Sequence, residues 1–165
     1  MSDILKHRND DVISVYNKFS DTVYRVCFVM LKNTEEAEDA TQNTFIKYMN
    51  CGKEFESDEH VKAWLIVTAK NECKNNLTHW FKSRRTDFEE LPDVPYEDEH
   101  KSEVLETVLS LDKKYSVPLY LHYYEGYKTH EIAQMLNINH STLRANMNKA
   151  RKKLKLLLEE GEYED

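Results

Sequence analysis

Glycine and proline are scarce in this chain of 165 residues, which contains three of each. A β-sandwich or β-barrel needs many tight turns, and tight turns depend on these two residues, so a turn-rich β fold is excluded. Helices joined by short loops tolerate the shortage, and the 40% of residues that are hydrophobic are enough for packed cores. The composition therefore predicts an all-α fold.

Cysteine is also rare, and long apolar runs are missing from the sequence. Cys27, Cys51 and Cys73 are odd in number, far apart and outside any CxxC motif, so we expect buried or inert thiols without a disulfide framework or metal site. No apolar run approaches the roughly 20 residues that cross a bilayer, and the N-terminus lacks the apolar stretch of a signal peptide. Glycine-rich loops and recognisable catalytic spacings are missing too. We expect a cytoplasmic protein with no membrane insertion, no cofactor and no enzymatic activity.

The net charge of −7 is unevenly distributed along the chain. Residues 82–106 carry nine acidic and four basic side chains, whereas residues 107–165 carry eight acidic and nine basic ones. Ionic screening acts over about 8 Å at physiological salt, so a distant acidic segment opposes a basic cluster only weakly. The overall acidity therefore does not exclude binding to nucleic acid.

Residues 129–154 contain two stretches of apolar periodicity, separated by three residues, Asn137 to Asn139. Apolar residues in both stretches recur at steps of three and four, which predicts a helix-turn-helix. Asn139 is a suitable N-cap for the second helix, and Ile138 is expected to be buried and to fix the turn to the core. The expected inward residues are Ile132, Ala133, Leu136, Leu143, Met147, Ala150 and Leu154.

The second of these helices carries basic residues and no acid from Arg144 to Lys155. The first residues of a recognition helix reach base edges, whereas later basic residues hold phosphates. Arg144 can pair with guanine through two hydrogen bonds, worth about 1–3 kcal/mol against a wrong base, and Asn146 is suited to adenine. Candidate base readers are His140, Ser141, Thr142, Arg144 and Asn146, and candidate phosphate contacts are Lys149, Arg151, Lys152 and Lys153.

Three further helices are predicted in the first half of the chain. Steps of three and four between apolar residues predict a first helix of roughly five turns that ends near Leu31. Asn33 and Glu36 form a capping box for a second helix, Gly52 suits its C-terminal end, and Ser57 caps a third helix. The expected inward residues of the first helix are Val12, Tyr16, Phe19, Val23, Val26 and Met30. Those of the second helix are Ala37, Thr41, Phe45, Tyr48 and Met49. Those of the third helix are Val61, Trp64, Leu65, Thr68, Leu77, Trp80 and Phe81.

The other faces of the third helix carry lysines and asparagines beside aromatic residues. Such a mixture binds single-stranded nucleic acid through phosphate contacts, amide hydrogen bonds and stacking. A solvated face over a core has the same composition. The polar residues concerned are Lys62, Lys70, Asn71, Lys74, Asn75 and Asn76.

Residues 82–103 have no sustained apolar period, contain two prolines and change from basic to acidic, so we predict a linker. Either it is a flexible tether, or it is an acidic strand that imitates nucleic acid in a basic channel of a large partner. Beyond it, Pro118 is expected to kink a helix or to follow closely on a helix start, and Gly126 to end that helix. The predicted segments are a domain at 1–81, the linker at 82–103, a domain at 104–158 and a frayed acidic tail at 159–165.

Four stretches together resemble a known family: AEDATQNTF at 37–45, AWLIVTAKNECKN at 63–75, YYEGYKTHEIAQMLNI at 123–138 and STLRANMNKARKKL at 141–154. In this order, with an acidic linker between the second and third, the chain resembles the small two-domain sigma factors of bacterial RNA polymerase, the extracytoplasmic-function (ECF) group of the sigma-70 family. The resemblance implies a helical bundle like sigma region 2 and a helix-turn-helix like sigma region 4. It also implies an alternative sigma factor that binds core RNA polymerase and directs promoter-specific transcription initiation.

The resemblance further implies roles for single residues. The family's DxxQxxF pattern falls on Asp39, Gln42 and Phe45, in the helix that docks on the clamp of the largest polymerase subunit. Trp64 and Asn71 fall in the region that melts and reads the minus-ten element, although packing is an alternative role for Trp64. The implied docking residues are Asp39, Gln42, Asn43 and Ile46, and the implied minus-ten residues are Lys62, Trp64, Lys70, Asn71, Lys74 and Asn75.

Further implied contacts are the minus-thirty-five element of promoter DNA, the flap of the second-largest polymerase subunit and an anti-sigma factor. Three positions depart from the family pattern. Asn43 replaces an acid, Asn146 replaces a basic residue, and Lys128 replaces a capping serine, which moves the expected helix start to Thr129.

The alternative function is a stand-alone helix-turn-helix regulator whose N-terminal helices dimerise or sense a ligand. The two functions differ in one observable property. A sigma factor gives specific transcripts when it is added to core polymerase, whereas a regulator binds duplex DNA tightly by itself.

Overall fold

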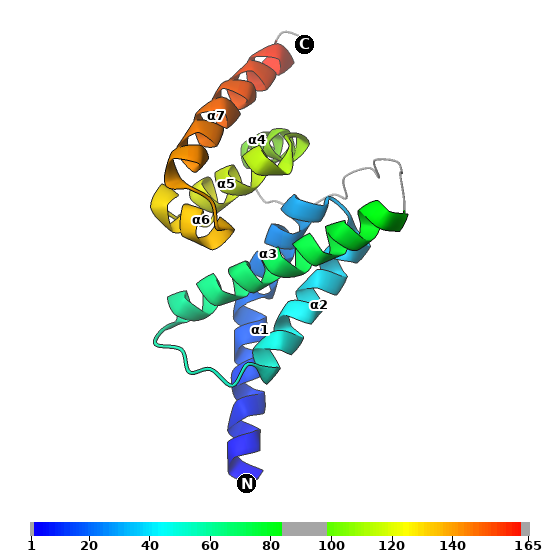
Figure 1. The fold of residues 1–165 in the computed structure, drawn as a ribbon, viewed down its shortest axis with the longest axis vertical. Coiled ribbons are helices and arrows are strands. Elements are labelled where there is room, and N and C mark those ends of the chain that lie inside the picture. Colours follow the sequence, from blue (N-terminus) through cyan, green and yellow to red (C-terminus); the bar gives the residue numbers. More distant parts are fainter. Residues whose placement is uncertain (1, 84–98, 163–165) are drawn as a thin grey trace. The chain divides into compact units, whose positions relative to one another are not determined.

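The computed structural model describes the backbone of residues 2–83 and 99–162, and the surroundings of the side chains of residues 11–75 and 103–160. Every regular element within these ranges is an α-helix, which confirms the predicted fold class. The helices belong to two compact units, residues 1–89 and residues 90–165 (Figure 1). None of the described helices combines the length and the apolar character that crossing a membrane requires. Most of the predicted linker and the predicted inward side chains Leu77, Trp80 and Phe81 lie outside the described residues.

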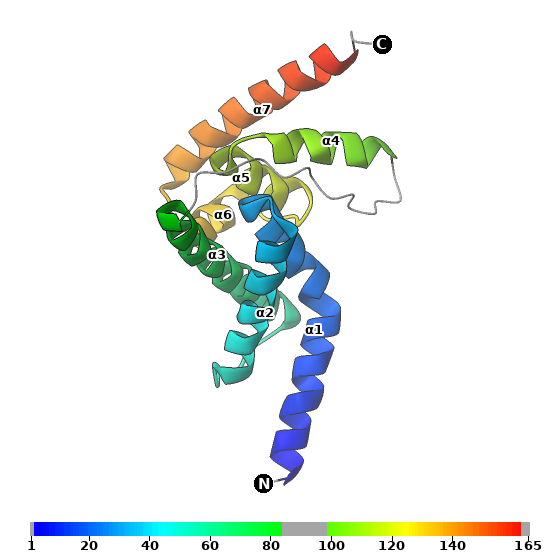
Figure 2. The same cartoon turned by 90° about the vertical axis from the view of Figure 1, so that its right-hand side faces the viewer.

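The N-terminal unit is a bundle of three helices, α1 (Ser2–Leu31), α2 (Thr34–Asn50) and α3 (Asp58–Ser83), in which each helix packs against the other two. α1 ends at Leu31 as predicted but is longer than five turns. Its first turns extend beyond the end of α2 (Figures 1 and 2). Apolar periodicity did not predict these turns because a helix, once nucleated, propagates through polar residues.

The three-helix arrangement buries a wider arc of each helix than a single apolar stripe. Tyr16 and Met49 were predicted to face inward, but they are 46% and 47% exposed, so both predictions are wrong. Thr41 and Thr44 are buried, and their hydroxyl groups donate to backbone carbonyls four residues earlier, at 2.6 and 2.7 Å. Buried hydroxyls are tolerated when they are paired in this way. The buried residues that the stripes missed are Val15, Cys27, Phe28, Val29, Ala40, Thr44, Ile66, Ala69, Glu72 and Cys73.

The helix ends in this unit follow local side-chain chemistry. The side chain of Asn33 accepts the N–H of Glu36 at 3.0 Å, which confirms Asn33 as the N-cap of α2. Ser57 Oγ accepts the N–H of His60 at 3.2 Å at the start of α3, again as predicted. Gly52 follows the C-cap of α2 with φ of 63°, a left-handed conformation that suits glycine.

Two of the three thiols meet inside this bundle. Cys27 of α1 and Cys73 of α3 both have no exposed surface, whereas Cys51 is partly exposed. The Cys73 thiol donates a hydrogen bond to Cys27, and this bond together with burial raises the pKa of Cys73. Two cysteines that are far apart in the sequence are therefore neighbours in the core.

The C-terminal unit consists of α4 (Glu99–Ser110), α5 (Lys113–Tyr123), α6 (Thr129–Leu136) and α7 (His140–Glu162). α7 packs against each of the other three helices. Both ends of the predicted linker are helical, because α3 continues to Ser83 and α4 already begins at Glu99. These turns are rich in charged and polar residues, so they carry no apolar period that could have marked them as helix.

Pro118 and Gly126 act where they were predicted to act. Pro118 is buried in α5 only five residues after the helix begins, and α5 continues to Tyr123. Gly126 lies beyond the end of α5 with φ of 78°. α6 begins at Thr129, as expected, with Lys128 in the N-cap position. The N–H of Lys128 donates to the Glu131 carboxylate at 2.9 Å.

The turn between α6 and α7 is held by its backbone. Asn137 adopts the left-handed conformation, with φ of 54° and ψ of 50°, and the N–H of Ile138 donates to the carbonyl of Ala133 at 3.0 Å. Ile138 is 37% exposed, so the prediction that its burial fixes the turn is wrong. The predicted inward faces of both helices are confirmed by the buried residues Ile132, Ala133, Leu143, Met147 and Ala150, to which the structure adds Met135.

Candidate functional site

The outer face of α2 carries the four residues predicted to dock on polymerase. Asp39, Gln42, Asn43 and Ile46 are all exposed, and Ile46 is 52% exposed. Gln42, Asn43 and Ile46 follow Asp39 by three, four and seven residues, and these spacings keep all four on one side of the helix. The opposite side of α2 is packed in the bundle core. α2 therefore has one buried face and one face that is open to a partner.

Apolar side chains on α1 extend this exposed surface. Tyr16 meets Phe45 of α2 edge to face, with their ring centroids 4.9 Å apart. Ile13, one turn before Tyr16, is 58% exposed, and Met49 of α2 is 47% exposed. Exposed apolar side chains that gather across two helices are typical of protein interaction surfaces. Sequence periodicity missed this feature because it placed Tyr16 and Met49 in the core.

Trp64 belongs to an aromatic cluster at the start of α3. Its ring lies edge-on to Tyr48 and Phe55, with centroid distances of 6.0 and 5.8 Å. Tyr48 Oη also donates to the Asp11 carboxylate at 2.9 Å, and burial and this hydrogen bond raise the pKa of Tyr48. The indole of Trp64 thus contributes to packing between α2, α3 and the loop that joins them.

Asparagines and lysines line the solvent side of α3 beyond this cluster. Asn71, Lys74 and Asn75 are exposed, and Lys70 is half-buried. Burial and then the nearby charge of Lys74 lower the pKa of Lys70. Lys62 lies nine residues before Asn71, which places the two on opposite sides of the helix. The lysines at 70 and 74 therefore form a local pair of like charges that an anion would stabilise.

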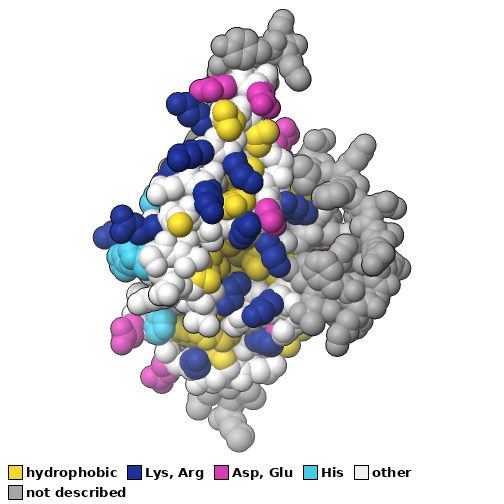
Figure 3. Space-filling model, turned by 45° about the horizontal axis from the view of Figure 1, so that its top comes forward, with side chains coloured by type: hydrophobic (Ala, Val, Ile, Leu, Met, Phe, Trp, Pro, Cys, Tyr) yellow, Lys and Arg dark blue, Asp and Glu magenta, His cyan; other side chains and the backbone are white. Residues whose placement is uncertain are grey.

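The outward face of α7 is polar and basic. Ser141, Thr142, Arg144, Lys149 and Lys152 are exposed opposite the buried Leu143, Met147 and Ala150. Figure 3 shows dark blue side chains gathered along α7, with acidic side chains near its end. His140 Nε2 lies 3.0 Å from the hydroxyl of Thr129, which ties the first turn of α7 to the first turn of α6.

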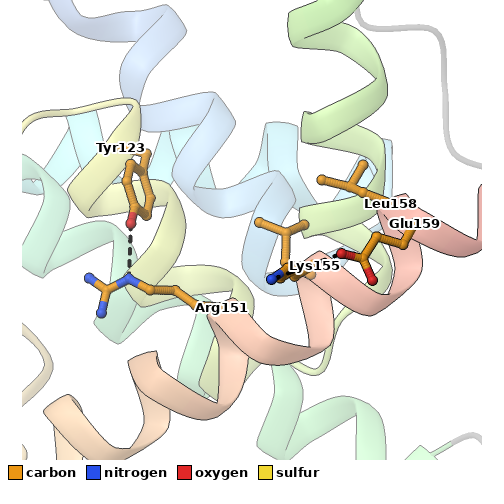
Figure 4. A pocket seen from close by; sticks show the side chains of 6 residues that line it. Tyr123, Arg151, Lys155, Leu158 and Glu159 are labelled. Carbon is orange, nitrogen blue, oxygen red and sulfur yellow. Dashed lines mark hydrogen bonds and ion pairs between the residues drawn. The ribbon is translucent and has the colours of Figure 1, made fainter. Parts of the chain in front are cut away.

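Two basic residues on the flanks of α7 are held by tyrosines of α5. Arg151 Nε donates to Tyr123 Oη at 2.9 Å, and its guanidinium lies 5.9 Å from the centre of that ring (Figure 4). On the other flank, the Lys153 ammonium lies 4.7 Å from the centre of the Tyr115 ring. Side chains fixed in this way lose less conformational entropy when they meet a phosphate.

A shallow pocket of about 270 Å³ lies beside Arg151 (Figure 4). An ion pair between Lys155 and Glu159, with N···O of 3.9 Å, borders it. Beyond it α7 exposes apolar surface, since Leu156 and Leu157 are 59% and 41% exposed. The lining residues are Tyr123, Arg151, Leu154, Lys155, Leu158 and Glu159.

One exposed polar residue of α7 was missed from the sequence. Asn148 lies four residues after Arg144, on the same side of the helix, and is exposed. Asn146, which was selected as an adenine reader, is half-buried instead. Spacing from Arg144 alone could have identified Asn148.

Comparison with known proteins assigns both units to one family. Residues 15–86 match sigma-70 region 2, and residues 101–154 match sigma-70 region 4. Together these matches cover well over half of the chain. The first match lies within the N-terminal unit, residues 1–89, and the second within the C-terminal unit, residues 90–165.

Relatives of known role are similar to nearly the full chain. The ECF RNA polymerase sigma factor SigW of Bacillus subtilis (strain 168) is 25% identical, over 88% of this chain and 86% of its own. SigX, an ECF RNA polymerase sigma factor of the same organism, is 23% identical over 88% of this chain and 84% of its own.

Two solved structures share the fold. The sigma factor RpoE of Bartonella quintana, crystallised with the anti-sigma factor NepR, has a TM-score of 0.73 and 18% identity over 90% of this chain and 97% of its own. CnrH in complex with the cytosolic domain of CnrY has a TM-score of 0.64 and 19% identity over 92% of this chain and 89% of its own. The chain therefore belongs to the ECF group of the sigma-70 family, whose members are non-enzymatic sigma factors that bind core RNA polymerase and direct transcription initiation.

Proposed function

We propose that the outer face of α2 docks this sigma factor on the clamp of the largest polymerase subunit. The observation that carries the proposal is that Asp39, Gln42, Asn43 and Ile46 share one exposed face of a helix whose other face is packed. A rigid helix with polar groups around an apolar side chain offers both orientation and burial to a partner. Met49 of α2 and Tyr16 of α1, whose ring meets Phe45 of α2, are exposed and add apolar area beside this helix.

The solvent side of α3 contacts the minus-ten element in this proposal. Asn71 and Asn75 supply amide groups to unstacked bases, and Lys70 and Lys74 supply charge to the phosphates. Burial is the larger cause of the lowered pKa of Lys70, and the charge of Lys74 is the smaller one. A phosphate near the two lysines would relieve the repulsion between them. Trp64 acts mainly by packing, and Lys62 lies away from this surface.

α7 enters the major groove of the minus-thirty-five element in this proposal. His140, Ser141, Thr142 and Arg144 lie in its first turns, where a recognition helix reaches base edges. Lys149, Arg151, Lys152 and Lys153 follow, and they would hold phosphates on either side of the groove. Two of these cations are already held in place by tyrosines of α5.

Two further partners follow from the same surfaces. The exposed leucines near the end of α7 offer an apolar contact for the flap of the second-largest polymerase subunit. An anti-sigma factor that covers the α2 face would compete with polymerase. The similar RpoE was crystallised with an anti-sigma factor, NepR. The proposed site of action is the cytoplasm. A stand-alone regulator is not supported, since region 2 forms the N-terminal half of the chain.

Binding of the full chain to core polymerase tests the docking assignment. Asp39→Lys combined with Gln42→Ala should weaken binding at least about tenfold, because it reverses a charge and removes an amide at the centre of the proposed interface. Binding can be measured by the change in anisotropy of a labelled chain. Glu54→Lys makes the same charge change on an exposed loop and should leave binding unchanged. Equal binding by all three proteins would contradict the assignment.

A further inference from the structure

Asn148 has no role in the proposals above, although it shares the outward face of α7 with two candidate base readers. Ser141 and Arg144 lie seven and four residues before it, spacings that place all three on one side of the helix. All three are exposed. Recognition helices of homeodomains read bases from positions spread over about two turns, which is the separation between Ser141 and Asn148. Asn148 is therefore placed to reach the same groove.

The side-chain amide of Asn148 is oriented by a neighbour. Arg151 Nη1 donates to Asn148 Oδ1 at 3.3 Å. A guanidinium group has donors but no acceptor, so only the oxygen of the amide is stable facing it. The NH₂ group of Asn148 consequently points away from Arg151. The amide therefore has one preferred orientation before DNA binds.

Arg151 is in turn anchored by the scaffold of the unit. Its Nε donates to Tyr123 Oη at 2.9 Å (Figure 4), and its guanidinium carbon lies 5.9 Å from the centre of the Tyr123 ring. Tyr123 is the last residue of α5, which packs directly on α7. A chain of contacts thus runs from α5 through Arg151 to the amide of Asn148. These two hydrogen bonds use two of the five donors of Arg151, and the others remain for a phosphate.

We propose that Asn148 is a specificity-determining residue that reads adenine, and that Tyr123 and Arg151 position its amide. The proposal rests on the proposed function of α7 as the reader of the minus-thirty-five element. Adenine presents an acceptor, N7, and a donor, the N6 amino group, in the major groove. The NH₂ group of Asn148 can donate to N7. Its Oδ1 accepts from Arg151 through one lone pair and can accept from the N6 amino group through the other.

Transcription from a promoter library tests the proposal. The library randomises each base pair of the minus-thirty-five element, and the full chain is used with core polymerase. Asn148→Ala should reduce discrimination for adenine at one base pair by about fivefold or more and leave the other positions unchanged. Gln134→Ala removes an exposed amide from α6 of the same motif and should leave every position unchanged. The assignment is overturned if Asn148→Ala has the same library profile as the wild type. It is also overturned if Asn146→Ala, and not Asn148→Ala, loses discrimination for adenine.

Tyr123→Phe tests the positioning contacts. It keeps the ring and removes the hydroxyl that holds Arg151, so it should weaken discrimination at the same base pair and have no further effect in the Asn148→Ala background. The positioning role is overturned if Tyr123→Phe leaves discrimination at that base pair unchanged. It is also overturned if discrimination falls equally at every base pair of the element. Arg144→Ala separates this proposal from the one on which it rests. If Arg144→Ala alters the library profile and Asn148→Ala does not, only the role of Asn148 fails. If neither variant alters it, the proposed function of α7 fails as well.

Discussion

Lys47 of α2 forms an ion pair with Glu72 of α3, and the carboxylate is the buried member of the pair. The side chain of Lys47 is 54% exposed, whereas that of Glu72 is 9% exposed. We expect Lys47→Ala to lower the free energy of unfolding by about 1–2 kcal/mol, because it leaves a buried carboxylate without its cation. This loss in the free energy of unfolding is smaller than for a fully buried ion pair, because water screens the charge of Lys47. Urea unfolding followed by tryptophan fluorescence measures it, and both tryptophans lie in the N-terminal unit.

A second variant separates the ion pair from other effects of the substitution. Lys47→Ala combined with Glu72→Gln removes the stranded charge and should recover part of the lost stability. Lys53→Ala, an exposed lysine in the loop after α2, is the matched control and should change stability little. If Lys47→Ala and Lys53→Ala have equal effects, the pair does not stabilise the bundle.

The N-cap of α2 predicts a second effect on stability. Asn33→Ala should lower the free energy of unfolding of the N-terminal unit by about 1 kcal/mol, because the N–H of Glu36 loses its acceptor. The same fluorescence measurement applies. Asn33→Ser keeps a capping oxygen and should be milder, and Asn17→Ala on the exposed side of α1 should be close to neutral. Equal loss with alanine and serine would show that capping is not the cause.

The helix-turn-helix should respond very differently to two apolar substitutions. Leu143 has no exposed surface, so Leu143→Ala should lower the free energy of unfolding by about 2–5 kcal/mol. Ile138→Ala should cost less than about 1 kcal/mol, because the backbone of the turn holds it and the side chain is partly exposed. Hydrogen exchange of the α6 and α7 amides measures both changes. Similar losses for the two variants would mean that Ile138 does anchor the turn.

Arg144 should affect promoter choice more than promoter affinity. Arg144→Ala is expected to reduce transcription mainly at promoters with the cognate minus-thirty-five sequence, since a base contact is lost. Lys152→Ala should weaken binding similarly on all sequences. It should also reduce the slope of log binding constant against log salt concentration by about 1, as expected for the loss of one phosphate contact. Transcription from cognate and altered promoters at several salt concentrations measures both. A uniform loss with Arg144→Ala would assign Arg144 to phosphate as well.

Features that depend on neighbouring residues could be predicted from the sequence. Asn33 and Ser57 cap helices because a side-chain oxygen reaches an amide three residues later, and both were identified. Gly52 and Gly126 were identified because left-handed conformations favour glycine. The inward face of α7 followed from its apolar period, since this amphipathic helix packs against the unit along one face.

Features that depend on tertiary packing could not be predicted in the same way. Tyr16 fits the apolar period of α1, yet it is 46% exposed and its ring meets Phe45 of α2 edge to face. Cys27 and Cys73 share no sequence signal that would bring them together. In the candidate site, the spacing of Asn148 from Arg144 was visible in the sequence, but its contact with Arg151 and the anchor at Tyr123 required the structure.

Chemical modification of the two buried thiols, Cys27 and Cys73, can report transient opening of the N-terminal bundle. A water-soluble thiol reagent can modify Cys51 directly, but it reaches Cys27 and Cys73 only while the helices separate. The rate of modification of the two buried thiols, followed by mass spectrometry of this chain, therefore reports how often the bundle opens. A partner that binds only the closed bundle slows that rate by a factor of one plus its free concentration divided by its Kd. The affinity for polymerase or for an anti-sigma factor is then measurable without attaching a label to the binding surface.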